Sequence, residues 1–157
     1  MGKAIGIDLG TTNSVVAYKD TAVKIIQTGA NNEDLCRSCV ALDKSNQFLV
    51  GNTVYHGWKR YTPNIVVSVK RLMGTAFSDP MVQKMKSDKR NYPYGIKKPG
   101  GGTDEAVSVV LRGREFSPEQ ISAEIPYHAK PHLPLRLCHL LVENLVLSRS
   151  APKFLNH

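Results

Sequence analysis

The sequence lacks any uninterrupted apolar stretch that would cross a lipid bilayer, which takes about 20 residues of helix. It also lacks the pattern of a secretory signal, because Lys3 is followed by only a brief apolar run that Asp8 interrupts. These absences argue against a membrane-spanning function. They predict a cytoplasmic protein with no membrane partner.

Cysteine is scarce, with three residues in the chain. Cys36 and Cys39 are separated by two residues and offer two ligands where a structural zinc ion takes four. No second pair follows, so such a site would need further ligands such as His132 and His139 near the C-terminus. In a reducing cytosol we expect Cys36 and Cys39 to be free thiols at a strand edge.

Acidic residues are outnumbered, since 13 Asp and Glu stand against 21 Lys and Arg and the net charge is +8. An excess of this size can attract an acidic partner. The basic residues are scattered, however: Asp88 separates Lys86 from Lys89, and no nucleic-acid-binding module is recognisable. We interpret the excess as a solvated face and expect no nucleic-acid partner.

What the sequence does contain is a glycine-threonine turn between two short apolar runs. Residues 4–7 and 15–18 have the pattern of short strands, so residues 8–14, Asp-Leu-Gly-Thr-Thr-Asn-Ser, are predicted to connect them in a hairpin. Gly10 permits a backbone bend in which successive N–H groups converge on one anion. The hydroxyl groups of Thr11 and Thr12 add donors. The chemistry that this pattern indicates is phosphate binding.

Asp8 stands at the end of the first predicted strand, beside this turn. A carboxylate repels a phosphate, so its natural role next to one is to hold Mg²⁺ through oxygen or water ligands. The alternative is an ordinary turn in which Asn13 tolerates a left-handed conformation. Spacing alone leaves both interpretations open.

The middle of the chain predicts more strands and then a helix. Apolar runs at residues 23–26, 40–42 and 47–51 indicate short strands of a mostly antiparallel sheet. A helix is predicted from Pro63 to Gly74, with Thr62 as its N-cap and apolar residues at helical spacing. Lys70 lies near the end of this predicted helix.

Beyond Gly74 the sequence predicts three more elements. Met81, Val82 and Met85 indicate a peripheral helix, and residues 105–111 a strand. The glycine-rich residues 99–104 are a turn and not a phosphate loop, because no Lys-Ser or Lys-Thr follows them. A last helix starts at Ser117-Pro118 with a capping box, and Pro126 is expected to end it after about two turns.

Two segments resemble the seventy-kilodalton heat-shock (DnaK-type) chaperone family. Residues 1–14 contain Ile-Asp-Leu-Gly-Thr-Thr-Asn-Ser, which matches the family's first phosphate motif almost letter for letter. Residues 63–74 end in Lys-Arg-Leu-Met-Gly, similar to the family's Lys-Arg-Leu-Ile-Gly. The resemblance implies an α/β fold for residues 1–125: a partial actin-like ATPase (ribonuclease H-like) fold, first lobe only. Residues 36–39 depart from the family's Arg-Thr-Thr-Pro-Ser-like segment.

The resemblance also implies ligands and roles. The cofactors would be ATP or ADP and Mg²⁺. Lys70 would be catalytic and face the γ-phosphate, and Asp8 would hold the magnesium ion through water. The nucleotide-binding residues would be Gly10, Thr11, Thr12 and Asn13. Unfolded peptides and co-chaperones would be partners only of a complete protein.

Residues 126–157 differ in character from the rest of the chain. They hold four of the five histidines and four of the nine prolines, with a leucine-rich run. The resemblance ends at Ile125, so we interpret residues 126–157 as a divergent tail produced by a frame change or truncated reading. The alternative is a genuine extension in which Leu137, Leu140 and Leu141 pack as a short helix.

The family's second phosphate loop and adenosine pocket have no match in residues 126–157. We therefore expect an ATP-binding fragment of a chaperone that does not hydrolyse ATP alone. One alternative is a non-catalytic remnant or interaction module that exposes an apolar face. Another is a different actin-like ATPase, such as a sugar kinase or filament protein, against which the segment Lys70-Arg71-Leu72 discriminates.

Overall fold

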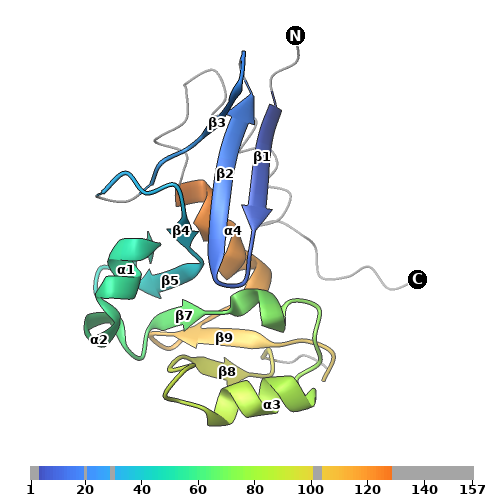
Figure 1. The fold of residues 1–157 in the computed structure, drawn as a ribbon. Helices are drawn as coiled ribbons and strands as arrows, with labels where there is room; N and C mark the ends of the chain where they lie inside the picture. Colours follow the sequence, from blue (N-terminus) through green and yellow to red (C-terminus); the bar gives the residue numbers. More distant parts are fainter. Residues whose placement is uncertain (1–3, 20, 29–30, 101–103, 129–157) are drawn as a thin grey trace.

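The computed structural model describes residues 4–19, 21–28, 31–100 and 104–128, which form three antiparallel sheets with short helices around them (Figure 1). In chain order the elements are β1 (Ala4–Leu9), β2 (Asn13–Lys19), β3 (Val23–Ile25), β4 (Cys36–Arg37), β5 (Cys39–Leu42), β6 (Phe48–Val50), α1 (Asn52–His56), α2 (Trp58–Tyr61), β7 (Ile65–Val67), the 3-10 helix η1 (Val69–Leu72), α3 (Pro80–Ser87), β8 (Gly95–Lys97), β9 (Ser108–Leu111), β10 (Arg114–Phe116) and α4 (Pro118–His128). This is the mixed α/β class that the sequence predicts. Most of the divergent tail lies outside the described residues. Within the described ranges, every helix is too short or too polar to cross a bilayer.

The first sheet carries the predicted hairpin. Its order is β1-β2-β3, with β4 also paired to β2. β1 and β2 pair antiparallel from Ala4↔Lys19 to Leu9↔Ser14, which leaves residues 10–12 as the turn. Ser14 and Val16 of β2 are buried, whereas Asn13, Val15 and Ala17, which alternate with them, are partly exposed. One face of the hairpin therefore packs on the core. The turn lies at the end of the hairpin that faces η1 and β7 (Figure 1).

The second sheet, with the order β6-β5-β7, corrects the prediction of a helix from Pro63 to Gly74. Residues Ile65–Val67 form β7, which pairs with β5 through Val40↔Val66. Three consecutive β-branched residues favour a strand, and all four residues of β5 are buried, so pairing with β5 covers a hydrophobic surface. Only Val69–Leu72 is helical, as a 3-10 turn that follows Ser68 in the left-handed conformation (φ 54°).

Thr62 also differs from its predicted role. It does not cap a new helix but ends α2, where its hydroxyl donates to the carbonyl of Trp58 at 2.9 Å. Residues 63 and 64 then lead directly into β7. The helix boundary that the Thr-Pro pair signals is therefore an ending and not a start.

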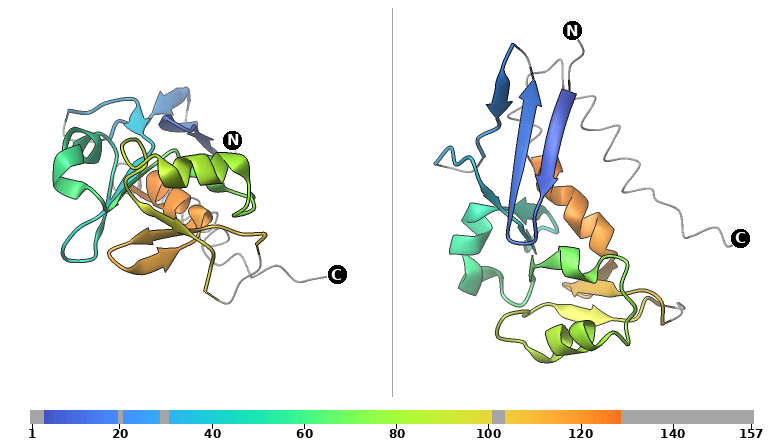
Figure 2. Two further views of the ribbon diagram at one scale, coloured as in Figure 1. Left: turned by 90° about the horizontal axis from the view of Figure 1, so that it is seen from below. Right: turned by 45° about the vertical axis from the view of Figure 1, so that its right-hand side comes forward.

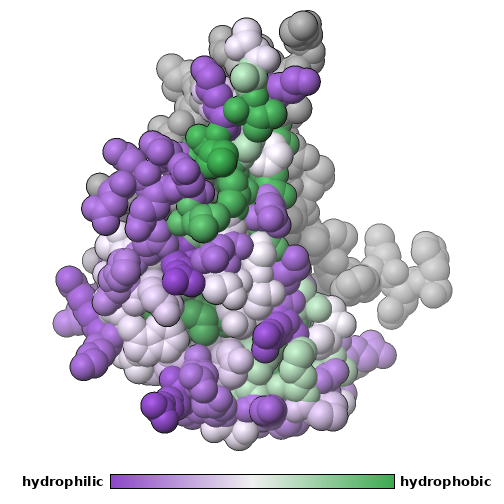
Figure 3. Space-filling model, in the orientation of Figure 1, coloured by the Kyte–Doolittle hydropathy of each residue, from purple (hydrophilic) through white to green (hydrophobic). Residues whose placement is uncertain are grey.

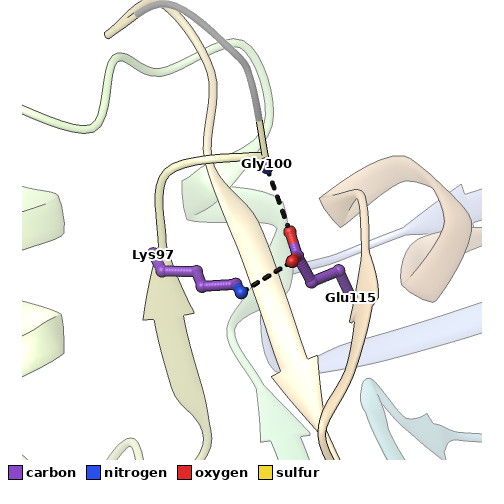
Figure 4. Close-up of polar contacts among 3 residues, drawn as sticks. All are labelled: Lys97, Gly100 and Glu115. Carbon is purple, nitrogen blue, oxygen red and sulfur yellow. Dashed lines mark hydrogen bonds and ion pairs between the residues drawn. The ribbon is translucent and has the colours of Figure 1, made fainter.

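The third sheet has the order β10-β9-β8 and packs against α3, which is the predicted peripheral helix. Val82 and Met85 of α3 are buried. Glu115 of β10 reaches across β9 to Lys97 of β8, with the carboxylate 2.6 Å from the ammonium group, and accepts the N–H of Gly100 (Figure 4). The Lys97 ammonium lowers the pKa of the Glu115 carboxyl. Because both side chains are largely exposed, this ion pair contributes little to stability.

Helix α4 packs against β2, β5, β6 and η1, and Figure 2 shows it beside the β1–β2 hairpin. Its predicted capping box forms: the amide of Gln120 donates to the Ser117 hydroxyl, and the amide of Ser117 donates to the Gln120 side chain. The expected end at Pro126 is wrong, since α4 continues to His128. A proline this close to the C-terminus removes one helical hydrogen bond, and the burial of Ile121 and Ile125 on the core offsets that loss.

Candidate functional site

Gly10 begins the turn between β1 and β2, and the turn requires a glycine there. A Cβ atom at this position would lie 2.2 Å from the backbone oxygen of Asn13. Real Cβ atoms do not approach backbone oxygens this closely, so any side chain would force the turn open. The turn therefore keeps its shape only because residue 10 has no side chain.

Ser38, which the sequence analysis did not single out, fixes this turn from the segment between β4 and β5. Its hydroxyl donates to the carbonyl of Gly10 at 2.7 Å, and its amide donates to the carbonyl of Thr12 at 2.8 Å. The hydroxyl also lies 2.8 Å from that of Ser14 in the buried interior. These bonds hold the turn's carbonyls toward the protein. Within the described chain, the N–H groups of Thr11 and Thr12 donate to no protein acceptor.

Lys70 lies against the same turn although it is 61 residues away in sequence. Its ammonium group donates to the carbonyl of Leu9 at 2.7 Å, while the side chain as a whole is exposed. Val69 and Leu72, on the same 3-10 turn, are buried and anchor the backbone that presents Lys70. The structure thus brings together the predicted phosphate turn and the predicted cation.

Asp8 is exposed on β1, two residues before Gly10. Side chains alternate along a strand, so Asp8 and Leu9 point to opposite faces of the hairpin. In the described ranges, no group of three or more His, Cys, Asp and Glu side chains is placed to bind a metal ion. A single carboxylate with water and phosphate ligands is a set that fits Mg²⁺, which usually keeps several waters. Asp8 therefore fits a water-mediated magnesium contact at the rim of this turn.

Cys36 and Cys39 are free, buried thiols that lie beside Gly51, the residue before α1. Cys39 donates to the carbonyl of Gly51 at 3.1 Å, and a Cβ on Gly51 would lie 2.9 Å from the sulfur of Cys36. Burial raises the pKa of Cys39 from 9.0 to about 12, with the neighbouring Cys36 as a second cause. The pair is therefore packed as neutral, unreactive side chains.

We expect Cys39 to resist alkylation in the folded chain. In a Cys36→Ala, Cys138→Ser background, iodoacetamide should react with Cys39 more than about 100-fold slower near neutral pH than in concentrated urea, because burial suppresses the thiolate and blocks access. Equal rates would show that the thiol is not buried.

The raised pKa of Cys39 also sets a pH dependence of stability. Folding favours the neutral thiol, so this contribution is fully present below the ordinary pKa of 9.0 and is lost as the pH rises through about 12. A Cys39→Ala variant should lose less stability across that window than the parent chain. Urea denaturation at several pH values measures the difference.

Known proteins are similar to this chain over most of its length. A family model described as "Hsp70 protein" matches residues 4–134. The chain is also 35% identical over 125 residues to the chaperone protein dnaK1 of Synechocystis sp. (strain ATCC 27184 / PCC 6803 / Kazusa), a stretch that covers 80% of this chain and 17% of the relative. The chain thus spans less than a fifth of the length of the curated relative that it matches. The family model covers the β1–β2 turn and every described element that follows it.

Proposed function

The chain belongs to the Hsp70 family, and on this premise we propose that it carries the phosphate-binding part of the first lobe of an actin-like (ribonuclease H-like) ATPase domain. The observation that carries the proposal is the bond from Lys70 to Leu9, which sets a cation beside a glycine turn with free N–H donors. The ligand is ATP or ADP with Mg²⁺. The corresponding cellular function is that of a nucleotide-binding fragment of a cytoplasmic molecular chaperone.

Each residue of the turn has a part in this proposal. The N–H groups of Thr11 and Thr12 and their hydroxyls donate to phosphate oxygens, and Gly10 lets the backbone approach. Asn13 follows directly after the turn, at the start of β2. Magnesium, when bound, neutralises charge on the phosphates, and Asp8 holds one of its water ligands.

Lys70 is the proposed catalytic residue. Its ammonium group is exposed, so it can exchange the Leu9 carbonyl for a phosphate oxygen without losing a buried partner. A cation there stabilises negative charge that develops on the transferred phosphoryl group and helps to orient the attacking water. Such stabilisation is strong only where water is excluded.

The exposure of Asp8, Thr12 and Lys70 limits what this chain does alone. Water surrounds these groups and screens the charges that catalysis needs. We therefore propose that the 157-residue chain binds MgATP weakly and that hydrolysis requires the remainder of a complete chaperone. Unfolded peptides and co-chaperones are partners of that complete protein, and nucleic acid is not a partner.

Two glycines on the same hairpin provide a matched test. Gly10→Ala places a Cβ 2.2 Å from the Asn13 oxygen, whereas a Cβ at Gly6 meets no atom within 4 Å. We expect Gly10→Ala to abolish saturable MgATP binding in a calorimetric titration, and Gly6→Ala to bind as the parent chain does. Circular dichroism checks that both variants fold. Equal binding by the two folded variants would remove the turn from the nucleotide site.

A second candidate is a non-catalytic interaction module, which the exposed side of the first sheet favours. Val23 is 70% exposed and Ile25 is 49% exposed, and they lie on one face of β3, two residues apart. Figure 3 shows hydrophobic surface over the strands of this sheet. Apolar surface of this kind marks either a binding face or an aggregation liability. A chain with this function alone would not respond to MgATP in the same titration.

A further inference from the structure

A pocket of about 400 Å³ lies between the second and third sheets, and none of its lining residues belongs to the β1–β2 hairpin. Its walls come from the β5–β6 turn at residues 43–45, the end of α2, Asn64 ahead of β7, and the β9–β10 turn at Arg112. Three parts of the chain, residues 42–49, residues 60–64 and Arg112, therefore meet around one hollow.

The pocket is positively charged. Lys44, Arg60 and Arg112 line it together with a single carboxylate, that of Asp43, so three cations against one anion leave a net charge of +2. In the part of the chain that the structure describes, none of the three cations forms an ion pair. The Asp43 carboxylate instead accepts the amides of Ser45 and Gln47, at 2.8 and 2.9 Å, and closes its own turn.

Arg112 is held in place by its neighbours. Its amide donates to the Asn64 side chain at 2.7 Å, and its Nε donates to the carbonyl of Asp43 at 2.7 Å. Its backbone has a φ of 49°, a left-handed conformation that is uncommon outside glycine, asparagine and aspartate. Because Nε is occupied, the two terminal nitrogens of the guanidinium remain as donors for a ligand. A guanidinium group held in this way loses little conformational entropy when it binds an anion.

The pocket also has an apolar wall. Leu42, Leu49 and Tyr61 line it beside the cations. Its volume falls within the range of about 300–1,000 Å³ that is usual for small-molecule sites. The hollow is therefore large enough for an anionic group with an apolar or ring-shaped body attached.

We propose that this pocket binds a small phosphorylated molecule, with its phosphate at Arg60 and Arg112 and its body on the apolar wall. The Arg60 guanidinium lies over the Tyr61 ring, 5.8 Å from its centroid, so the phosphate is bound at the edge of that wall. A phosphate monoester carries a charge of about −1.5 to −2 near neutral pH, which matches the net +2 of the pocket better than a single carboxylate does. Arginine forks bind phosphate oxygens in pairs, which gives direction as well as attraction. A solvated basic face would spread its cations over a convex surface, whereas Lys44, Arg60 and Arg112 line one hollow.

Phenyl phosphate is the probe that tests this site. In ¹⁵N-resolved NMR titrations of the full chain, the amides of Asn64 and Arg112 should shift saturably. The variant Arg112→Asn keeps a residue that tolerates the left-handed backbone, and it should weaken binding about tenfold because it removes a charge-assisted bidentate contact. Arg60→Gln should weaken binding to a similar extent without touching that turn.

Arg114→Ala is the matched control, because Arg114 is two residues away and its guanidinium lies over the Phe116 ring, 5.2 Å from the centroid. Its binding should equal that of the parent chain within about twofold. Shifts confined to residues 10–12, equal binding of phenylacetate, or no loss of affinity in Arg112→Asn and Arg60→Gln would each overturn the proposal. Weaker binding of methyl phosphate than of phenyl phosphate would support the part assigned to the apolar wall.

Discussion

Replacing Lys70 by Ala should abolish ATP hydrolysis while MgATP binding persists. Lys70 approaches the phosphate turn from η1, and the turn's own donors do not depend on it. Removal of one group aimed at developing charge typically slows a reaction by about 100- to 1,000-fold. We expect a loss of that size in the rate of the chemical step and at most a few-fold change in affinity.

The experiment needs a complete active site. Residues 4–125 of this chain can be fused to the remainder of the Synechocystis chaperone to which it is similar, and hydrolysis measured in a single turnover with enzyme in excess. Arg71→Ala is the control, because Arg71 is exposed and adjacent to Lys70. Unchanged single-turnover hydrolysis in Lys70→Ala would remove Lys70 from the reaction.

Replacing Leu72 by Ala should destabilise the whole described fold. Leu72 is 1% exposed and belongs to the same buried cluster as Val50, Ile121 and Ile125. Truncation of a buried leucine to alanine usually costs about 2–5 kcal/mol, because packing contacts are lost and a cavity remains. A domain with about 5–15 kcal/mol of total stability loses a large share of it.

Urea denaturation followed by circular dichroism measures this effect, with Arg71→Ala again as the exposed neighbour. That control should stay within about 0.5 kcal/mol of the parent chain. The Leu72→Ala variant should also loosen η1 and so displace Lys70 from Leu9. If the two variants unfold at the same urea concentration, η1 is not packed on the core as described.

Local patterns predicted the elements that depend on local interactions. The β1–β2 hairpin, the strand at β5 and the capping box at Ser117 follow from short apolar runs and from one capping pair. In each of these elements, the residues that decide the conformation lie within a few positions of one another. The sequence was therefore sufficient for them.

The helix predicted from Pro63 to Gly74 failed because its apolar spacing fits two structures. Ile65, Val66, Val69 and Leu72 match helical periodicity, yet Val66 pairs with Val40 on β5, 26 positions away. A distant strand partner is invisible to a periodicity argument. The same holds for Pro126, which tolerates a helical position because α4 is buried by packing.

The residues proposed to bind the ligand were predicted from the sequence, whereas the residue that holds the turn in shape was not. Asp8, residues 10–13 and Lys70 follow from the motif and the family resemblance. Ser38, which bonds to Gly10 and Thr12, lies in the segment where the sequence departs from that resemblance, so nothing pointed to it. The boundary at Ile125 stays a prediction, and the family match continues to residue 134.

The most direct measurement is an NMR titration of the ¹⁵N-labelled chain with MgATP, read at the amides of Gly10, Thr11 and Thr12. We predict saturable shifts at these three amides, together with a change at Lys70 as its ammonium group exchanges the Leu9 carbonyl for phosphate. Shifts that are absent, or that appear only at the basic pocket around Arg112, would contradict the assignment of the β1–β2 turn as the phosphate site.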